Sequence, residues 1–229
     1  KMPCSLTSDW SAMTFQAICF DLDGTLLNTI DDLADCMNEA LGQLGLPPLS
    51  IEQCKLFVGD GLRVYAERAM GPASQDEELL GRCIALTRDQ YTRRWADKTR
   101  PYEGVAELLD ELTARGLKMT VLSNKPDTFT KLIVEKLLPR WRFDLVWGES
   151  AQRIKKPDPT SAKQMAADLG LAPADFLYLG DTNTDMQTAV AAGMFPVGAL
   201  WGFRSAQELT DNGAKVLIER PMDVLALLG

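Results

Sequence analysis

The decisive stretch of this sequence is Phe20-Asp21-Leu22-Asp23-Gly24-Thr25-Leu26. It follows the apolar run Ala17-Ile18-Cys19-Phe20, which predicts a buried strand. Gly24 permits a turn at the end of that strand, and the turn leaves backbone N–H groups that can hold a phosphate. Two carboxylates here can divide the chemistry, because one can act as a nucleophile while the other moves a proton. Like charges this close repel each other, so the motif also predicts a bound cation.

Three later segments carry the other polar groups of such a site. They are Ser123-Asn124-Lys125 after the apolar run 117–122, Lys155-Lys156-Pro157-Asp158-Pro159, and Gly180-Asp181-Thr182-Asn183-Thr184-Asp185 after the apolar run 176–179. Ligand sites of open α/β sheets form at the carboxyl ends of the strands, so we expect these segments to meet. The predicted pocket collects Asp21, Asp23, Ser123, Lys156, Asp181 and Asp185.

The second half of the chain alternates predicted strands with predicted helices. Apolar residues recur at helical spacing over 105–112, 162–169 and 185–192, and a glycine follows each segment, at 116, 170 and 193. Pro126 stands where a further helix is expected to begin. This alternation predicts an α/β fold, with a Rossmann-like parallel sheet and helices on both of its faces.

The interval between the first two predicted strands does not fit that plan. One helix is enough to cross between neighbouring parallel strands. Here the apolar spacing predicts helices at 33–44, 51–58, 62–70 and 77–95. We therefore expect an inserted all-α cap domain at residues 28–100, and an α/β core domain made of residues 1–27 and 101–229.

Composition limits the partners. The net charge is −8 over 229 residues, so neither nucleic acid nor an anionic membrane is an expected partner. A phosphorylated substrate would need a local cationic site. Residues 1–14 lack the continuous apolar core of a signal peptide, and no run is long enough to span a bilayer. Five scattered cysteines suit a reducing compartment, so we expect a cytoplasmic protein; they are Cys4, Cys19, Cys36, Cys54 and Cys83.

The sequence contains no histidine. That absence excludes Ser-His-Asp and Cys-His nucleophile systems, and it excludes metal sites with histidine ligands. An enzyme of this composition that uses acid–base chemistry must rely on carboxylates, which the first motif supplies.

Taken in order, the four motifs resemble those of the haloacid dehalogenase-like superfamily. They are Asp21-Leu22-Asp23-Gly24-Thr25, Ser123 after the second strand, Lys156-Pro157-Asp158-Pro159, and Gly180-Asp181 with Asp185. The resemblance runs from Phe15 to the C-terminus. Two further segments resemble the phosphoglycolate phosphatase branch, namely Pro101-Tyr102-Glu103-Gly104-Val105 and Trp201-Gly202-Phe203-Arg204-Ser205. This resemblance implies hydrolysis of a small phosphomonoester through an aspartyl-phosphate, with 2-phosphoglycolate as the first candidate substrate.

The resemblance also suggests a role for each motif residue. Asp21 would attack phosphorus, and Asp23 would protonate the leaving group and then activate water. Lys156 would neutralise charge on the nucleophile and the phosphoryl group. The remaining phosphate-binding positions would be Gly24, Thr25, Ser123 and Asn124.

Magnesium is the expected cofactor. Asp181 and Asp185 stand four residues apart at a predicted helix start, where they share one face. With Asp21, and with Asp23 through its backbone carbonyl, they would offer the oxygen ligands that Mg²⁺ prefers.

Two arginines are candidates for specificity. Arg63 follows the predicted loop Gly59-Asp60-Gly61 in the cap, where it could bind a substrate carboxylate in a bidentate way or simply be solvated. Arg204, in the late tryptophan-containing segment, is a second candidate.

Other functions remain compatible with these motifs. A phosphomutase similar to β-phosphoglucomutase, a pyrophosphatase or a nucleotide phosphatase could use the same core residues. A phosphatase-like regulatory binding protein is the non-enzymatic alternative. The expected partner is a small phosphorylated molecule, and the chain is expected to be a monomer or a homodimer.

Overall fold

The computed structural model describes residues 14–228. Residues 1–13 and 229 lie outside this range, and so do Cys4 and both ends of the predicted core domain. The predictions made for residues 1–13 therefore lie outside the described residues as well. Within 14–228, no helix is both long enough and apolar enough to cross a membrane.

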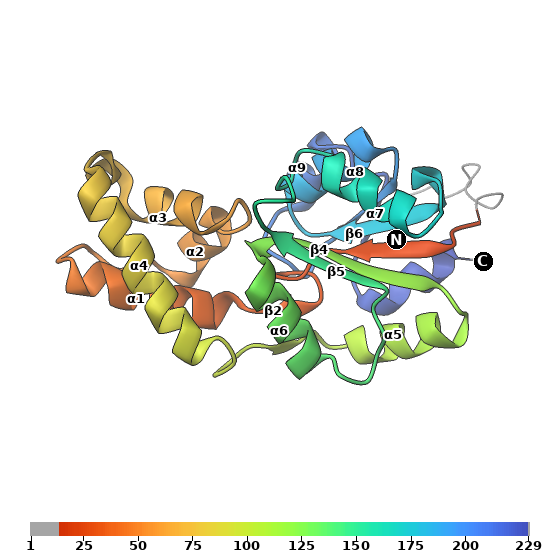
Figure 1. The fold of residues 1–229 in the computed structure, drawn as a ribbon, viewed down its shortest axis with the longest axis horizontal. Helices are drawn as coiled ribbons and strands as arrows, with labels where there is room; N and C mark the ends of the chain where they lie inside the picture. The colour runs from red at the N-terminus through yellow and green to blue at the C-terminus, as the bar shows by residue number, and fades with distance from the viewer. Residues whose placement is uncertain (1–13, 229) are drawn as a thin grey trace, which may run out of the picture.

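A parallel sheet forms the centre of the molecule (Figure 1). Its strands lie in the order β5-β4-β1-β6-β7-β8, so β1 is central and pairs with β4 on one side and β6 on the other. Their bounds are β1 Ala17–Phe20, β4 Lys118–Pro126, β5 Leu145–Glu149, β6 Phe176–Gly180, β7 Phe195–Ala199 and β8 Val216–Ile218. The predicted α/β fold class is therefore confirmed.

Alternation along β1 divides the core between the two faces of the sheet. Ile18 and Phe20 pack into one buried cluster together with Leu108, and Ala17 and Cys19 pack into another together with Met165. Figure 1 shows helices above and below the sheet. On the first face lie α5 Val105–Ala114 and α6 Asp127–Leu137, and on the second lie α7 Thr160–Asp168 and α8 Asn183–Ala192.

The remaining elements of the core are short. A helix α9 Ala206–Asp211 follows β7, and single 3-10 turns lie at η3 Pro173–Asp175 and η4 Pro221–Leu227. Pro126 is the N-cap of α6 rather than its first helical residue, so that helix begins one residue later than expected.

The cap interval is helical, as expected from its apolar spacing. It holds α1 Ile30–Gln43, α2 Ile51–Phe57, α3 Leu62–Met70, the 3-10 turn η2 Gly71–Gln75 and α4 Glu77–Arg94. Met37, Leu41, Tyr65 and Leu80 are buried in a second cluster, which Phe203 of the core also joins. Figure 1 shows these helices beside the carboxyl edge of the sheet. We propose that residues 28–100 act as a separate cap domain, with the predicted bounds.

Two short strands join the cap to the core. β2 Leu27–Asn28 leaves the first motif and pairs antiparallel with β3 Arg100–Pro101, which returns from the cap. Asp32, which is 1% exposed, accepts hydrogen bonds from the amides of Lys98 and Thr99 and from the Thr99 hydroxyl at 2.7 Å. The start of α1 is thereby held to the returning segment, and both connections have a fixed geometry.

Candidate active site

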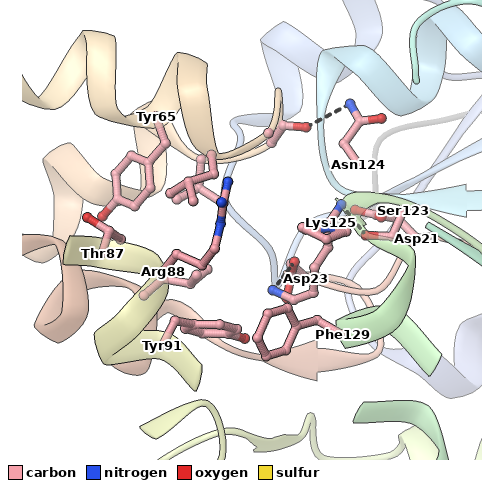
Figure 2. Close-up of a pocket in the computed structure, with 16 residues that line it drawn as sticks. Asp21, Asp23, Tyr65, Thr87, Arg88, Tyr91, Ser123, Asn124, Lys125 and Phe129 are labelled. Carbon is pink, nitrogen blue, oxygen red and sulfur yellow. Dashed lines mark hydrogen bonds and ion pairs between the residues drawn. The ribbon is translucent and has the colours of Figure 1, made fainter. Parts of the chain in front are cut away.

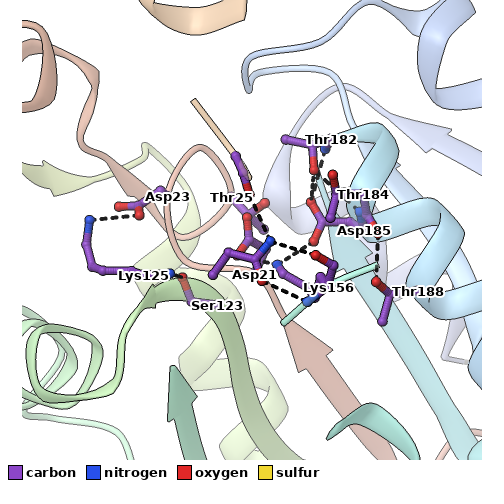
Figure 3. Close-up of polar contacts among 12 residues, drawn as sticks. Asp21, Asp23, Thr25, Ser123, Lys125, Lys156, Thr182, Thr184, Asp185 and Thr188 are labelled. Carbon is purple, nitrogen blue, oxygen red and sulfur yellow. Dashed lines mark hydrogen bonds and ion pairs between the residues drawn. The ribbon is translucent and has the colours of Figure 1, made fainter. Parts of the chain in front are cut away.

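Lys156 and two carboxylates form the buried centre of the site (Figure 3). Asp21 follows β1, and its amide donates to the Leu179 carbonyl at the end of β6. Lys156 Nζ lies 2.8 Å from Asp21 Oδ1 and 2.7 Å from Asp185 Oδ1. The Lys156 side chain is only 3% exposed. Burial disfavours the charge on Lys156, but the attraction of Asp185 and Asp21 prevails and raises the pKa of this ammonium above its usual value.

Asp181 lies in a fitted cradle next to this centre. Thr25 Oγ1 donates to Asp181 Oδ1 at 2.8 Å, and the Phe203 amide donates to Oδ2 at 2.8 Å. A Cβ atom added at Gly24 would lie 2.3 Å from Asp181 Oδ2, and one added at Gly202 would lie 2.2 Å from Asp181 Cβ. Gly24 also has φ +89°, which side-chain-bearing residues rarely adopt. The cradle requires glycine at both positions.

Asp21, Asp181 and Asp185 bring carboxylate oxygens to within 4.8 Å of one another. Burial raises the pKa of Asp181 to about 7, and the negative charge of Asp185 adds to this effect. Burial, followed by the charge of Asp185, also raises the pKa of Asp21 well above its usual value. A hard divalent cation bound between close, buried carboxylates stabilises their charged form, and carboxylate oxygens are the ligands that it prefers. The described residues therefore fit a divalent metal ion.

Asp185 is already held on both of its oxygens. Thr182 is the N-cap of α8, and its hydroxyl and amide donate to Asp185 Oδ2 at 2.7 and 3.1 Å in a capping box. Asp185 Oδ1 accepts from Lys156 and, at 3.4 Å, from the Tyr178 hydroxyl. The helix start therefore fixes Asp185, and Asp185 in turn fixes the ammonium of Lys156.

Asp23 pairs with a lysine that the sequence analysis did not select. Lys125 Nζ lies 2.8 Å from Asp23 Oδ2, and the Lys125 side chain is 5% exposed. Asp23 Oδ1 is buried and has no hydrogen-bond partner among the described residues. The Lys125 ammonium also lies 4.7 Å from the ring centre of Tyr91 in cap helix α4. The sequence did contain a signal for Lys125, because it directly follows Ser123 and Asn124. The sequence analysis assigned the role of the functional lysine to Lys156 alone.

In the turn of the first motif, the backbone amides of Gly24 and Thr25 donate hydrogen bonds within the turn itself. Gly24 N donates to the Leu27 carbonyl at 2.9 Å, and Thr25 N donates to the Leu22 carbonyl at 3.4 Å. The Thr25 hydroxyl donates its hydrogen bond to Asp181. Among the described residues, no hydrogen-bond acceptor is assigned to the amides of Leu22 and Asp23. Those two amides, rather than the amides of Gly24 and Thr25, are open to an anion.

Ser123 and Asn124 lie where β4 loses its regular register with β5. Ser123 is 4% exposed, lines the cavity described below, and its Oγ accepts from the Lys125 amide at 3.2 Å. Asn124 Oδ1 accepts a hydrogen bond from the Lys156 amide at 2.8 Å. Asn124 Nδ2 donates to the carbonyls of Lys156 and Gly59 at 3.0 and 3.1 Å. Asn124 therefore ties the segment that carries Lys156 to the cap.

The cap loop 59–61 contacts the core at several points. Asp60 Oδ1 accepts from the Thr184 hydroxyl at 2.8 Å, Asp60 Oδ2 lies 2.6 Å from Arg68, and the Asp60 carbonyl accepts from Lys155 at 3.1 Å. Burial opposes the charge of Asp60, but the hydrogen bonds from Thr184 and Arg68 lower its pKa below the usual value. The loop is therefore held over the site by both backbone and side-chain contacts.

The segment Trp201–Arg204 contacts the turn of the first motif, Asp181 and the cap. Trp201 Nε1 donates to the Thr25 carbonyl at 3.0 Å, and Phe203 supplies its amide to Asp181. Arg204, 8% exposed, donates to the carbonyls of Lys55, Leu56 and Val58 at the end of cap helix α2. Arg204 thus contacts the cap backbone and also lies 3.3 Å from Glu208.

Arg63 does not lie where the sequence analysis expected it. Its guanidinium is 56% exposed and pairs with Glu67 at 2.9 Å and with Glu77 at 3.0 Å, both in the cap. Arg63 is not among the residues assigned to the cavity wall, although Gly61 and Leu62 are. The side chain following Leu62 points to the outer face of α3, a direction that the sequence alone does not give.

A cavity of about 90 Å³ lies between the cap and the core (Figure 2). Asp21, Asp23, Ser123 and Lys125 are on its core side. The cap side is lined mainly by apolar and aromatic residues, together with Thr87 and Arg88; these cap residues are Leu33, Val58, Leu62, Tyr65 and Tyr91. Arg88 was missed in the sequence because it stands in the polar stretch of a long helix, with no motif around it.

Comparisons with known proteins agree on one family. The family model for haloacid dehalogenase-like hydrolases matches residues 18–199. A phosphoglycolate phosphatase of Pseudomonas putida is 31% identical over 92% of this chain and 78% of its own length. Another, of Chromobacterium violaceum, is 34% identical over 85% of this chain and 89% of its own length.

Solved structures give the same picture. A crystal structure of a predicted phosphoglycolate phosphatase from Haemophilus somnus has a TM-score of 0.87 and 27% identity, covering 95% of this chain and all of the other. The matched fold includes both the sheet and the cap helices. The chain belongs to the haloacid dehalogenase-like hydrolase family.

Proposed function

We propose that this chain is a Mg²⁺-dependent phosphatase that hydrolyses a small phosphomonoester, with 2-phosphoglycolate as the preferred substrate. The observation that carries the proposal is the buried cluster of Asp21, Asp181 and Asp185 around Lys156, open to a small cavity that also contains Asp23. The relatives named above as phosphoglycolate phosphatases support the substrate.

Mg²⁺ would be held by Asp21 and Asp181, with Asp185 and the backbone carbonyl of Asp23 as the further candidates. When bound, Mg²⁺ would supply positive charge to the phosphoryl oxygens and neutralise the carboxylates around it. The close oxygens and the fitted cradle of Asp181 support this assignment.

Asp21 would act as the nucleophile. Lys156 binds Asp21 Oδ1, and no hydrogen bond joins Oδ2 to a described residue, which leaves this oxygen free to attack. A new bond from the Asp21 carboxylate to phosphorus would form as the ester P–O bond breaks, giving an aspartyl-phosphate and an alkoxide. Lys156, the Ser123 hydroxyl and the amides of Leu22 and Asp23 are the groups available to the phosphoryl oxygens.

Asp23 would move the proton in both steps. In its acid form it would protonate the departing alkoxide, so that the alcohol leaves neutral. The resulting carboxylate would then take a proton from the water that attacks phosphorus, and the Asp21 carboxylate would be released with inorganic phosphate. Lys125 binds only one Asp23 oxygen, and the other is unpartnered, which supports such a role.

The cap would restrict the size of the substrate. Enclosed drug-sized ligands occupy pockets of roughly 300 Å³ or more. The cavity here has about 90 Å³, so a substrate of a few heavy atoms beyond its phosphate is the best fit. Larger nucleotides would require the cap loop 59–61 to leave the core.

A panel of small phosphomonoesters tests this function. We expect phosphate release from 2-phosphoglycolate only with Mg²⁺ present, and a loss of roughly a thousandfold or more in Asp21→Asn because the nucleophile is gone. Asp31→Asn, a change in the first turn of α1, serves as the matched control. Full turnover by Asp21→Asn would contradict the mechanism. Interconversion of sugar phosphates without net phosphate release would identify a phosphomutase instead.

We further propose a cytoplasmic location and a monomer or homodimer. Cys19, Cys36, Cys54 and Cys83 are all free and buried, which supports a reducing compartment. Sedimentation analysis of the purified chain would establish its assembly.

A further inference from the structure

Arg88 is a cation in the cavity wall that the proposed mechanism does not use. It stands in α4 and lines the cavity together with Thr87 and Tyr91 of the same helix. Figure 2 shows its side chain reaching from the cap into the space between cap and core. The phosphoryl chemistry lies on the opposite side, at Asp21 and Ser123.

The Arg88 guanidinium lacks the partners that neighbouring arginines have. Arg93 pairs with Asp89, and Arg94 pairs with Asp35 and Asp97. No ion pair or side-chain hydrogen bond joins Arg88 to any residue between 14 and 228. Arg88 is exposed to solvent and also lines the cavity, and an arginine without a carboxylate partner in this position is available to an anionic ligand.

The charges of the cavity wall determine which cation can bind a second anionic group. Two of the residues that line it are cationic, Arg88 and Lys125. Lys125 is engaged by Asp23 at 2.8 Å, so Arg88 is the cation left for a second anionic group. The protein carries a net charge of −8, and without such a group it would repel a ligand that is negative at both ends.

The other side chains of the cap wall carry no positive charge. Leu33, Val58 and Leu62 are apolar, and a carboxylate placed against them would lose its hydration without compensation. Among the cavity-lining side chains of the cap, Arg88 is therefore the one that offers a positive charge to the anionic end of a bound molecule.

We propose that Arg88 binds the carboxylate at the non-phosphate end of the substrate, and that this contact selects short phosphomonoesters that carry a carboxylate. The inference rests on the proposed phosphatase function and adds a specificity-determining residue to it. It replaces Arg63, whose guanidinium pairs with Glu67 and Glu77 on the outer face of the cap.

Paired substrates test this contact. Arg88→Met keeps the aliphatic stem and removes the charge, whereas Arg88→Lys keeps a charge without the bidentate fork. Arg82→Met, an exposed change in the same helix outside the cavity wall, is the matched control. Each protein is assayed with 2-phosphoglycolate and with 2-hydroxyethyl phosphate, which has a neutral hydroxymethyl group in place of the carboxylate.

We expect Arg88→Met to lower kcat/KM for 2-phosphoglycolate by roughly ten- to a hundredfold, mainly through KM, and to leave 2-hydroxyethyl phosphate unaffected. Arg88→Lys should recover part of the loss, and Arg82→Met should behave as wild type. An equal loss on both substrates, or no loss on either, would overturn the assignment.

Inhibition provides a measurement that does not need turnover. 3-Phosphonopropionate has the shape and charges of 2-phosphoglycolate but no cleavable ester, and propylphosphonate lacks its carboxylate. Wild type should bind the first more tightly than the second, and Arg88→Met should remove that preference. If wild type released no phosphate from any ester, the proposed function would fail. The inhibitor preference would still decide the role of Arg88, because equal binding of the two phosphonates to wild type would overturn it.

Discussion

At the scale of single residues, three of the side chains proposed to act in catalysis or metal binding are each held by a second group that fixes their direction. Asp185 holds Lys156, Thr25 holds Asp181, and Lys125 holds Asp23. Such support matters because a catalytic group displaced by a fraction of an ångström loses much of its effect. The most informative of these supports is Lys125, since it also contacts the cap through Tyr91.

Lys125→Met should reduce kcat by roughly ten- to a hundredfold and change KM little. The substitution removes the ammonium that orients Asp23 and leaves a carboxylate buried without a partner. Steady-state kinetics with 2-phosphoglycolate measures the two parameters. Lys125→Arg should restore part of kcat, whereas a purely structural loss would not be rescued in this way.

Lys118→Met is the control for that experiment. Lys118 stands at the other end of β4, is 52% exposed, and pairs with Asp144 at 3.2 Å. Lys118 does not line the cavity, so wild-type kinetics are expected. Unchanged kcat in Lys125→Met would show that Asp23 does not depend on this lysine.

At the scale of elements, the parts with a strong periodic signal were predictable. The strand 17–20, the three helices of the second half and the four cap helices all follow from apolar spacing with glycine or proline at their ends. β5, β7 and β8 were not predicted. β8 has only three residues, and β7 contains Pro196 and Gly198, which are unfavourable in strands; the pairing of β7 with β6 and β8 overrides that preference.

The site shows the same division between local and long-range information. Motif order was enough to bring together Asp21, Lys156, Asp181 and Asp185, because all follow strands of one parallel sheet or the loops beside it. The directions of Arg63 and Arg88 depend on how the cap helices pack against each other and on the core. Sequence spacing carries no information on that packing, so Arg88 was missed.

The connection between cap and core offers a test at this scale. Asp32→Ala should lower the free energy of unfolding by about 2–4 kcal/mol, because it leaves the buried amide and hydroxyl of Thr99, and the amide of Lys98, without their acceptor. Urea unfolding followed by circular dichroism measures the change. Asp31→Ala, one residue earlier and partly exposed, should stay within about 0.5 kcal/mol of wild type. Equal losses in the two variants would contradict this account of the joint.

At the scale of the whole molecule, the buried carboxylates make stability depend on pH, and on the proposed function they would link it to metal binding as well. Asp181 titrates at about 7 in the folded, metal-free chain, mainly because burial disfavours its charge. In the unfolded chain it titrates near its ordinary value of about 3.9. The folded state therefore holds more protons between these two values, and the stability of the metal-free protein falls as pH rises through this window.

Added Mg²⁺ should reverse this trend. On the proposed function the ion would bind the deprotonated carboxylates, so protons would compete with it at low pH. Saturating Mg²⁺ should raise the melting temperature clearly more at pH 8 than at pH 5.5, as followed by thermal unfolding with and without the ion. In Asp181→Asn the difference between the two pH values should shrink. A larger stabilisation at pH 5.5 would be incompatible with carboxylate ligands of this kind.

The single lysine inside the carboxylate cluster has a consequence for the order of events in a turnover. With Asp21, Asp181 and Asp185 ionised, the ammonium of Lys156 leaves two negative charges uncompensated. A divalent ion is the smallest charge that cancels them, and a phosphate dianion arriving earlier would be repelled from a poorly screened interior. On the proposed function, we therefore expect Mg²⁺ to bind before the phosphorylated substrate.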